Sequence, residues 1–354
     1  MDRAQVLPRR MRNQHLWGAP LRTAPEVLGA LVAVQAQEFA YAKWALAQRT
    51  RTVVEADIAA AYAQGSILRT HLLRPTWHFV TPEDASWLLD LTAPRVHAVN
   101  GYYLRKLELD DATLAKTGEL IAAAVDGGNH LTRRQIGAML HAAGVEADGL
   151  RLGYILMCAE LDRVVISGVP KGRQHTYAAF GERVQASDPL GRDAALAQLA
   201  RRYLASRGPA TVRDLARWSG LTVADCRSGI DAVADEFRVD EVEGLALWYP
   251  PRKDTPPRPP VVDLVQGYDE CIMSYTETKG YLVEPDLAER GEPRYMHAVL
   301  VDGRVVGRWK HTLSARSATI DMELGRALTA RETAALDAEL RRYGEFLELR
   351  IERP

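Results

Sequence analysis

The fold is decided by residues 132–180, which read TRRQIGAMLHAAGVEADGLRLGYILMCAELDRVVISGVPKGRQHTYAAF. Thr132 and Gln135 form a capping box at the start of a short helix, and Gly144 suits the left-handed position that ends it. A second apolar helix follows around Leu156, and two strand-like runs then enclose a basic turn. The order helix, turn, helix and hairpin predicts a winged helix, a fold whose second helix and wing commonly contact DNA.

The same pattern recurs on both sides of this stretch. Further along the chain, Thr211 and Thr222 each open a short helix, and residues 237–249 predict a hairpin. An earlier copy is looser, with helical apolar spacing in residues 25–34 and a β-rich run in residues 68–80. We therefore expect three related units in tandem.

A proline-rich segment marks the clearest domain boundary. Six prolines lie from Pro250 to Pro260 and predict an extended linker, after which strand-like runs and a helix capped at Thr329 follow. The predicted fold class is α+β, with tandem winged helix-turn-helix units followed by a small C-terminal β-barrel-like domain. The predicted boundaries are 1–115, 116–188 and 189–250 for the three units, 251–260 for the linker and 261–354 for the β-rich domain.

Composition limits the classes of function. The 354 residues imply two or three domains, and 45 Lys and Arg against 46 Asp and Glu give no general attraction to nucleic acid. Any DNA-binding face must therefore be local. No run reaches the ~18 apolar residues of a membrane helix, and three scattered cysteines provide neither a disulfide framework nor zinc-ligand spacing. We expect a cytoplasmic protein with no metal and no cofactor.

Two glutamines follow an apolar helical pattern at Gln35-Ala36-Gln37. In a continued helix, side chains two positions apart point about 200° away from each other, so the two amides could not converge. If the helix ends near Gln35, both amides can face one side. The more common alternative is a pair of polar residues on a helix surface.

Residues 68–80, LRTHLLRPTWHFV, combine arginines, histidines, hydroxyls and a tryptophan in a strand-like segment broken by Pro75. This mixture is typical of surfaces that contact phosphates and stack on bases. The alternative is a wing whose Trp77 and Phe79 are core residues, and for those two side chains it is favoured. We assign candidate DNA contacts to Arg69, Arg74, Thr76 and His78.

The basic turn of the second unit carries Lys171, Arg173, Gln174 and His175. Exposed basic turns are usually solvated surface, but the wing tip of a winged helix is where contacts with the DNA backbone or minor groove are made. Both interpretations stay open, and these four residues are candidate DNA contacts.

Other chemistry has little support. The chain contains no Walker loop, GxGxxG, GxSxG or HExxH motif. Asp269 and Glu270 could perform acid–base work, although a hydrogen-bonded corner is the more common explanation for such a pair.

With these motifs described, the chain resembles the AlkZ and YcaQ family of winged-helix DNA glycosylases over essentially its whole length. The resemblance rests on Gln35-Ala36-Gln37, residues 69–80, the wing at 171–177 and Tyr268-Asp269-Glu270. It implies tandem winged helices and a C-terminal β-barrel around a DNA channel, with Gln35 and Gln37 as the catalytic Gln-hydrophobic-Gln motif. The YcaQ branch has an aspartate at the second motif position. With Gln37 at that position, this chain resembles the AlkZ branch more than the YcaQ branch. The AlkZ branch is associated with bulky adducts and crosslinks made by genotoxic natural products.

The resemblance predicts a monofunctional DNA glycosylase. Its substrates would be cationic N7- or N3-alkylated purines, and its product an abasic site. Glutamine has no useful pKa, but it can position a water and stabilise developing charge, which suffices when the leaving base already carries a positive charge. The expected partner is double-stranded DNA with alkylated purines, bound by a monomer through a local basic patch of Arg12, Arg74, Lys171 and Arg173. The alternative is a non-catalytic winged-helix DNA-binding protein or transcription regulator.

Overall fold

One arrangement of helices and strands occurs three times in the protein. The computed structural model describes residues 1–185, 188–252, 260–283 and 297–353, so most of the predicted linker at 251–260 lies outside the described residues. The first copy contains, in order, a helix, a short strand, two helices and a hairpin. Its three strands form a sheet of order β1-β3-β2. Its elements are α2 (Ala24–Leu31), β1 (Val34–Gln35), α3 (Phe39–Ala47), α4 (Glu55–Gln64), β2 (Leu68–Leu72) and β3 (Arg74–Val80).

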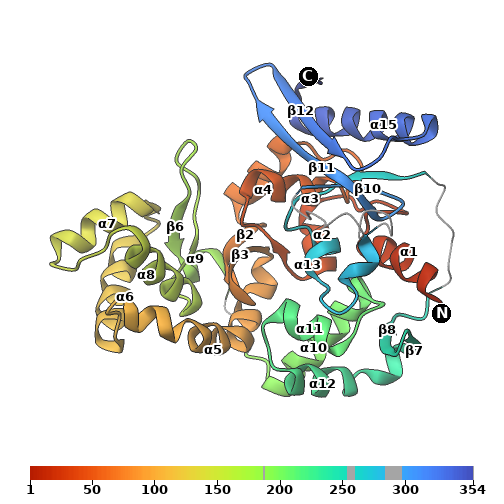
Figure 1. Ribbon diagram of the computed structural model, residues 1–354. Coiled ribbons are helices and arrows are strands. Elements are labelled where there is room, and N and C mark those ends of the chain that lie inside the picture. Colours follow the sequence, from red (N-terminus) through yellow and green to blue (C-terminus); the bar gives the residue numbers. More distant parts are fainter. Residues whose placement is uncertain (186–187, 253–259, 284–296, 354) are drawn as a thin grey trace.

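The second copy has the same order of elements and the equivalent sheet order β4-β6-β5. It consists of α6 (Asp111–Val125), β4 (Leu131–Thr132), α7 (Arg133–Ala142), α8 (Gly149–Leu161), β5 (Val165–Ser167) and β6 (Thr176–Ala179). The long helix α5 (Pro82–Lys106) connects it to the first copy, and the short α9 (Phe180–Arg183) follows it. The loop between β5 and β6 extends away from the neighbouring elements (Figure 1).

The third copy replaces the short first strand with an isolated bridge between Ala210 and Trp248. Its elements are α10 (Arg192–Arg207), α11 (Val212–Ser219), α12 (Val223–Asp231), the 3-10 turn η1 (Ala234–Glu236), β7 (Arg238–Val242) and β8 (Leu245–Tyr249). The helix α1 (Arg3–Asn13) packs against α10.

The C-terminal part is a five-stranded sheet of order β13-β12-β11-β10-β9, antiparallel except for the β12–β13 pair. Helix α15 packs along it (Figure 1). The elements are β9 (Val262–Leu264), α13 (Glu270–Met273), η2 (Lys279–Leu282), β10 (Ala298–Val301), β11 (Arg304–Leu313), β12 (Ser317–Leu324), α15 (Ala330–Leu347) and β13 (Arg350–Glu352). The α+β class is confirmed. In this C-terminal part, the five strands form one open sheet with β9 and β13 at its edges.

Local sequence signals placed many of these elements correctly. The side chains of Thr132, Thr211, Thr222 and Thr329 all cap helices as predicted. The break predicted at Pro75 is wrong, because the chain turns at Leu73, whose φ of 62° is unusual for leucine. Pro75 instead lies inside β3.

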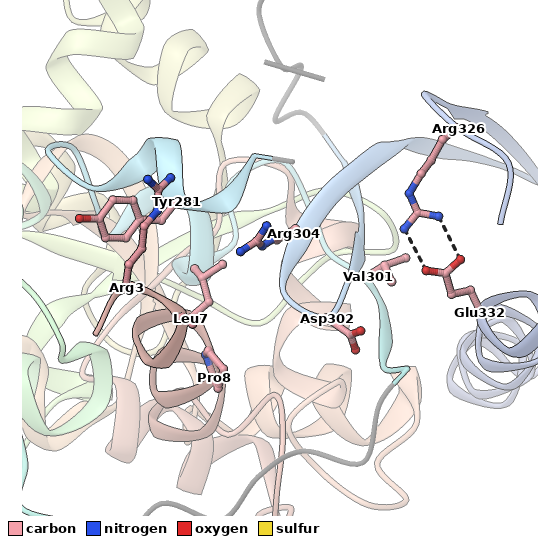
Figure 2. Close-up of a pocket in the computed structure, with 10 residues that line it drawn as sticks. Arg3, Leu7, Pro8, Tyr281, Val301, Asp302, Arg304, Arg326 and Glu332 are labelled. Atoms are coloured by element: carbon pink, nitrogen blue, oxygen red, sulfur yellow. Dashed lines mark hydrogen bonds and ion pairs between the residues drawn. The ribbon is translucent and has the colours of Figure 1, made fainter. Parts of the chain in front are cut away.

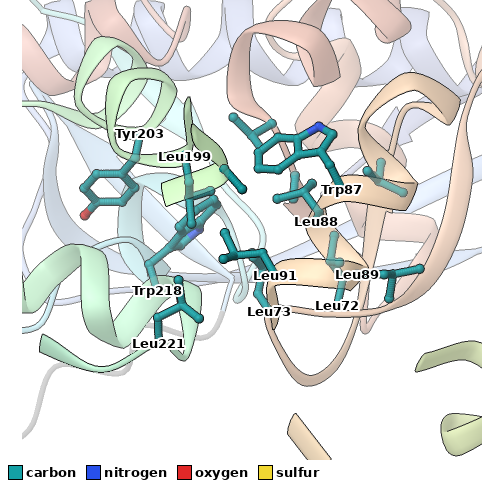
Figure 3. Packing of buried hydrophobic residues seen from close by; sticks show 14 of the residues in the cluster. Leu72, Leu73, Trp87, Leu88, Leu89, Leu91, Leu199, Tyr203, Trp218 and Leu221 are labelled. Carbon is teal, nitrogen blue, oxygen red and sulfur yellow. The ribbon is translucent and has the colours of Figure 1, made fainter. Parts of the chain in front are cut away.

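Two apolar cores join segments that are distant in the sequence. One combines the first copy with the C-terminal sheet and includes Trp44, Trp309 and Phe346. The other joins the β2–β3 hairpin, α5, α10 and α11, with Leu72, Leu91, Leu199 and Trp218 in contact (Figure 3). The first copy is therefore held from both sides. Within the described residues, no helix is both long enough and apolar enough to cross a bilayer.

Candidate active site

The two glutamines follow a sharp change in backbone conformation. Helix α2 ends at Leu31, and Val32 adopts a φ of 69°, a strained conformation for a β-branched residue. The chain then continues as β1, where Gln35 pairs with His78 of β3. The Ala36 amide donates to the Trp77 carbonyl oxygen at 2.8 Å. The helix therefore ends before Gln35, which is the condition under which both side-chain amides can face one side.

The environments of the two amides differ. Gln35 is only 2% exposed, and its Oε1 accepts a hydrogen bond from Arg74 Nη2 at 2.9 Å. Gln37 is exposed, and its Oε1 accepts from the Trp77 amide over a longer distance of 3.4 Å. Gln37 also lines a pocket of 760 Å³. One amide is therefore fixed inside the protein and the other faces open space.

A buried ion pair holds the backbone around Gln35. Arg207 donates to the carbonyl oxygens of Leu31 at 2.8 Å and Ala33 at 3.0 Å. Its Nη2 also donates to Glu270 Oε2 at 2.8 Å, and both side chains of this pair are fully buried. Glu270 Oε1 in turn accepts a hydrogen bond from the backbone N–H of Gln35 at 2.9 Å. These contacts connect α10 and α13 to the turn that precedes the motif.

The acidic pair at 269–270 has a structural role. Burial alone raises the pKa of Glu270, but the Arg207 guanidinium and the hydrogen bond from the Gln35 backbone N–H together outweigh burial and hold this pKa below its ordinary value. Asp269 forms a second buried pair with Arg49 at 2.7 Å. The hydrogen-bonded corner is therefore confirmed, and an ionised, fully enclosed Glu270 has no proton to donate. Sequence reasoning missed Arg207, because it lies 63 positions from Glu270 and no local pattern connects them.

Two predicted DNA contacts, Arg69 and Arg74, donate hydrogen bonds to the Gln35-Ala36-Gln37 motif. Arg69 is 8% exposed, donates from Nε to the Ala36 carbonyl oxygen at 3.0 Å, and stacks over the Trp77 ring at 4.3 Å. Arg74 is half-buried and donates to Gln35 and to the Trp218 carbonyl oxygen. Burial lowers the pKa of Arg74 to about 10, so it stays protonated at neutral pH.

His78 does not reach the surface. It is fully buried, and its Nδ1 lies 2.9 Å from the carbonyl oxygen of Thr76, which is itself half-buried. Burial and the nearby Arg74 depress the pKa of His78 to about 3, so the ring is neutral. The predicted direct DNA contact of His78 is contradicted by this burial, because no base or phosphate can reach the ring.

The pocket beside Gln37 lies between the first and second copies. It has four arginines, three aromatic rings and no carboxylate among the described residues that line it. They are Gln37, Phe39, Arg69, Trp77, Thr132, Arg133, Arg134, Leu152, Arg173, Gln174, His175 and Tyr177. The fold therefore brings the wing residues 173–175 and Arg69 to Gln37, whereas Lys171 is exposed and outside this lining. Sequence reasoning missed Phe39, Arg133, Arg134 and Tyr177.

His175 forms part of this wall as a neutral ring. It packs edge-on against Phe39 with ring centroids 4.5 Å apart. Burial, with smaller effects from Arg69 and Lys43, lowers the pKa of His175 to about 4. At neutral pH the cationic character of the pocket thus comes from its arginines.

Arg12 lies elsewhere. It belongs to α1 and lines a separate pocket. Helix α1 and the β5–β6 hairpin are on opposite sides of the molecule (Figure 1). The predicted single basic patch of Arg12, Arg74, Lys171 and Arg173 is therefore wrong in including Arg12, which lies apart from the β5–β6 hairpin that carries Lys171 and Arg173.

A further pocket of 370 Å³ lies where α1 meets the C-terminal sheet (Figure 2). Arg3, Arg304 and Arg326 line it together with Asp302 and Glu332, and Arg326 pairs with Glu332 at 2.9 Å. No motif residue takes part, so we do not assign the chemistry to it. In the part of the chain that the structure describes, no cluster of three or more His, Cys, Asp or Glu side chains is arranged to hold a metal.

Comparisons with known proteins agree on one family. The family model described as DNA glycosylase AlkZ-like matches residues 28–346. A curated interstrand DNA cross-link repair glycosylase from Streptomyces sahachiroi is 24% identical over 327 residues, which cover 86% of this chain and 87% of the relative. The solved structure of Streptomyces sahachiroi DNA glycosylase AlkZ matches with a TM-score of 0.81 at 22% identity, covering 100% of both chains. Since the family model spans most of its length, including both glutamines, this chain belongs to the AlkZ-like DNA glycosylase family.

Proposed function

We propose that the protein hydrolyses the N-glycosidic bond of cationic N7- or N3-alkylated purines in double-stranded DNA, leaving an abasic site. The observation that carries this proposal is the position of Gln37, which opens into a pocket lined by four arginines and no carboxylate among the described residues. Such a pocket attracts the DNA backbone and repels no part of it. The enzyme would be a monofunctional glycosylase, because the proposed attacking group is water.

The two amides have different roles in this proposal. A guanidinium has only donors, so the Gln35 atom that contacts Arg74 must be the amide oxygen. Gln35 is thereby oriented with its N–H donors directed elsewhere, where they can hold the oxygen of a water. Gln37 keeps a carbonyl lone pair free, because its contact with the Trp77 amide uses only one. Gln37 can therefore accept a hydrogen bond from the same water and orient it towards the sugar, and the proton lost when the water oxygen bonds to C1′ passes to solvent.

The neutral state of the nearby histidines supports a pre-activated substrate. With pKa values of about 3 for His78 and about 4 for His175, neither ring carries a proton to transfer to a departing base at neutral pH. An N7- or N3-alkylated purine needs no such proton, since it leaves as a neutral base. The chemistry then requires a positioned water and stabilisation of the cationic sugar.

The pocket favours bulky lesions. Phe39, Trp77 and Tyr177 provide ring faces within a space of 760 Å³, which exceeds what a methylated base needs. The relative from Streptomyces sahachiroi is named for interstrand crosslink repair. We therefore propose bulky or crosslinked natural-product adducts as the preferred substrates.

The remaining parts of the proposal concern architecture and setting. The three copies are proposed as winged-helix units, followed by a C-terminal domain at 261–354; the expected boundary between 1–115 and 116–188 falls inside α6, which belongs to the second copy, and the third unit is proposed at 189–250. The sheet orders β1-β3-β2 and β4-β6-β5 support this assignment. The protein would act as a cytoplasmic monomer on double-stranded DNA, without a metal or cofactor, and Lys171 and Arg173 would contact phosphates.

Abasic-site formation tests the proposal. Duplexes carrying N7-methylguanine or a bulky N7-alkylguanine would be incubated with wild type, Gln35→Ala, Gln37→Ala and the double variant. Gln64→Ala, which removes an exposed glutamine on α4, is the matched control. We expect release by wild type and by the control, and loss of release in the double variant while DNA binding is retained.

Two outcomes would contradict this assignment. Full release by the double variant would place the chemistry outside the motif. No release by wild type from either duplex, with salt-dependent binding intact, would favour the non-catalytic DNA-binding protein.

A further inference from the structure

A second cationic pocket lies between α1 and β8, away from both glutamines. Its volume is 240 Å³, and its basic side chains are Arg9, Arg12, His15 and Arg252. The rings of Trp17 and Tyr249 form part of its wall. None of the described residues that line it is acidic.

Like the pocket beside Gln37, this pocket combines several arginines with no acidic side chain among the described residues that line it. In the pocket of Figure 2, Asp302 and Glu332 balance three arginines. Here Asp240, which lies beside Tyr249, accepts hydrogen bonds from the Met1 ammonium group at 2.7 Å and the Tyr249 hydroxyl at 2.7 Å, and it also interacts electrostatically with Arg9. The positive charge that faces an anion in this partly enclosed space therefore comes from Arg12 and Arg252.

Arg12 also has a donor that the protein leaves unused. Its Nη2 is buried and has no hydrogen-bond partner among the described residues. Buried donors in native proteins are usually paired, so the described residues do not fully satisfy the Arg12 guanidinium.

Other contacts hold the walls in place without a ligand. Asn13 Nδ2 donates to the Gly208 carbonyl oxygen at 2.7 Å, and Arg10 Nε donates to the Pro209 carbonyl oxygen at 2.8 Å. These bonds fix the last turn of α1, which carries Arg12. His15 then adopts a φ of 59°, the left-handed conformation that commonly ends a helix, so the chain leaves α1 at the edge of the pocket.

We propose that this pocket is an anion site that binds a phosphate group through Arg12 and Arg252. Arginine matches the geometry of phosphate oxygens by paired N–H donors, and both Arg12 and Arg252 line the pocket. A space of 240 Å³ is large enough to hold one phosphate group. The phosphate comes either from the DNA backbone or from a free phosphate compound, and both sources use the same contacts.

Salt dependence of DNA binding tests the first source. The dissociation constant of an undamaged duplex would be measured over a range of salt concentrations for wild type and for Arg12→Ala/Arg252→Ala. If the pocket binds a DNA phosphate, the slope of log K against log salt falls by about 0.9, the value for one phosphate. Arg12→Lys, which keeps the charge, and Arg331→Ala, which removes an exposed arginine of α15, should leave the slope unchanged.

Calorimetric titration with inorganic phosphate tests the second source. Loss of phosphate binding in the double alanine variant with an unchanged DNA slope assigns the site to a free phosphate. If neither phosphate binding nor the slope changes, in a variant whose melting temperature equals that of wild type, the proposal is overturned. Base release at saturating DNA should be unaffected, because Gln37 lines another pocket. Failure here is therefore distinct from failure of the proposed glycosylase mechanism.

Discussion

At the scale of single residues, two contacts set the position of Gln35: its side-chain Oε1 accepts a hydrogen bond from Arg74, and its backbone N–H donates to Glu270. The condition that the helix must end before Gln35 could be stated from side-chain periodicity alone. The hydrogen bond from the Gln35 backbone N–H to Glu270 could not be predicted, because the two residues lie 235 positions apart. The hydrogen bond from Arg74 to the Gln35 side chain could not be predicted either, because it depends on the register of the β2–β3 hairpin. For the same reason, Arg74 looked like a DNA contact in the sequence.

Replacing Arg74 should impair the chemical step more than DNA binding. Arg74→Met removes the donor that orients the Gln35 amide, and a hydrogen bond to a charged group contributes about 1.5–3 kcal/mol. We expect kcat to fall by about 10- to 150-fold. Single-turnover base release with saturating DNA measures this value.

A matched variant separates positioning from binding. Arg173→Met removes an exposed arginine of the pocket beside Gln37. This variant should bind DNA more weakly, while its rate of base release at saturating DNA stays close to that of wild type. Arg74→Lys should restore only part of the rate, because lysine lacks the planar fork. An Arg74→Met enzyme with the wild-type kcat would show that the amide needs no such orientation.

The rate should also be insensitive to pH near neutrality. His78 and His175, with pKa values of about 3 and about 4, remain neutral from about pH 5.5 to pH 8, and the Glu270 carboxylate remains ionised. Single-turnover rates at saturating DNA should therefore be flat over that range. A bell-shaped profile centred there would indicate a general acid or base outside these groups.

At the scale of helices and strands, prediction succeeded where local chemistry defines an end. Threonine caps and the Glu243-Gly244 turn mark their elements in the sequence. Helix α4 was missed because its N-cap is Val54, a residue with no typical capping side chain. The turn at Leu73 was missed because leucine does not indicate a positive φ.

The contact between β9 and α15 should make stability depend on pH. Burial and the neighbouring Glu339 raise the pKa of Asp263 on β9 to about 7. The folded protein thus keeps a proton that the unfolded chain loses above about pH 4, and stability falls as pH rises from about 4 to about 7. Asp263→Asn removes this titration and can keep an acceptor for the Trp17 indole N–H, which lies 2.9 Å from the carboxylate.

Thermal denaturation across this range measures the effect. The variant should show a smaller decrease in melting temperature between pH 5 and pH 7.5 than wild type, at about the same melting temperature at the acidic end. Parallel pH profiles for the two proteins would show that Asp263 is ionised throughout in the folded state.

At the scale of the whole molecule, the first copy and the C-terminal sheet unfold as one unit in our interpretation. Their side chains form one apolar core, in which Trp44 of α3 contacts Phe346 of α15 with ring centroids 5.3 Å apart. The sequence predicted separate domains from a proline-rich segment. It could not show the shared core, because a buried face has the same apolar pattern whichever element covers it.

Truncating Phe346 should therefore destabilise both ends of the chain. Phe346→Ala leaves a cavity in this core and should cost about 3–5 kcal/mol of unfolding free energy. Amide hydrogen exchange should accelerate in α3 as well as in α15. Leu347→Ala, at a half-buried neighbouring position, should have a smaller effect. Faster exchange confined to α15 would show that the two regions are independent.

The buried contacts of Gln35 have a consequence for protein synthesis. A ribosome that has translated only through β8 has made both glutamines, but Gln266 and Glu270, which bond to Gln35, do not yet exist. The core around Trp44 likewise waits for Tyr343 and Phe346, which are added near the end of translation. Gln35 and Gln37 are therefore made early, but we expect them to reach their final positions only late in folding. A prematurely terminated chain would then have no organised site with which to excise bases from DNA.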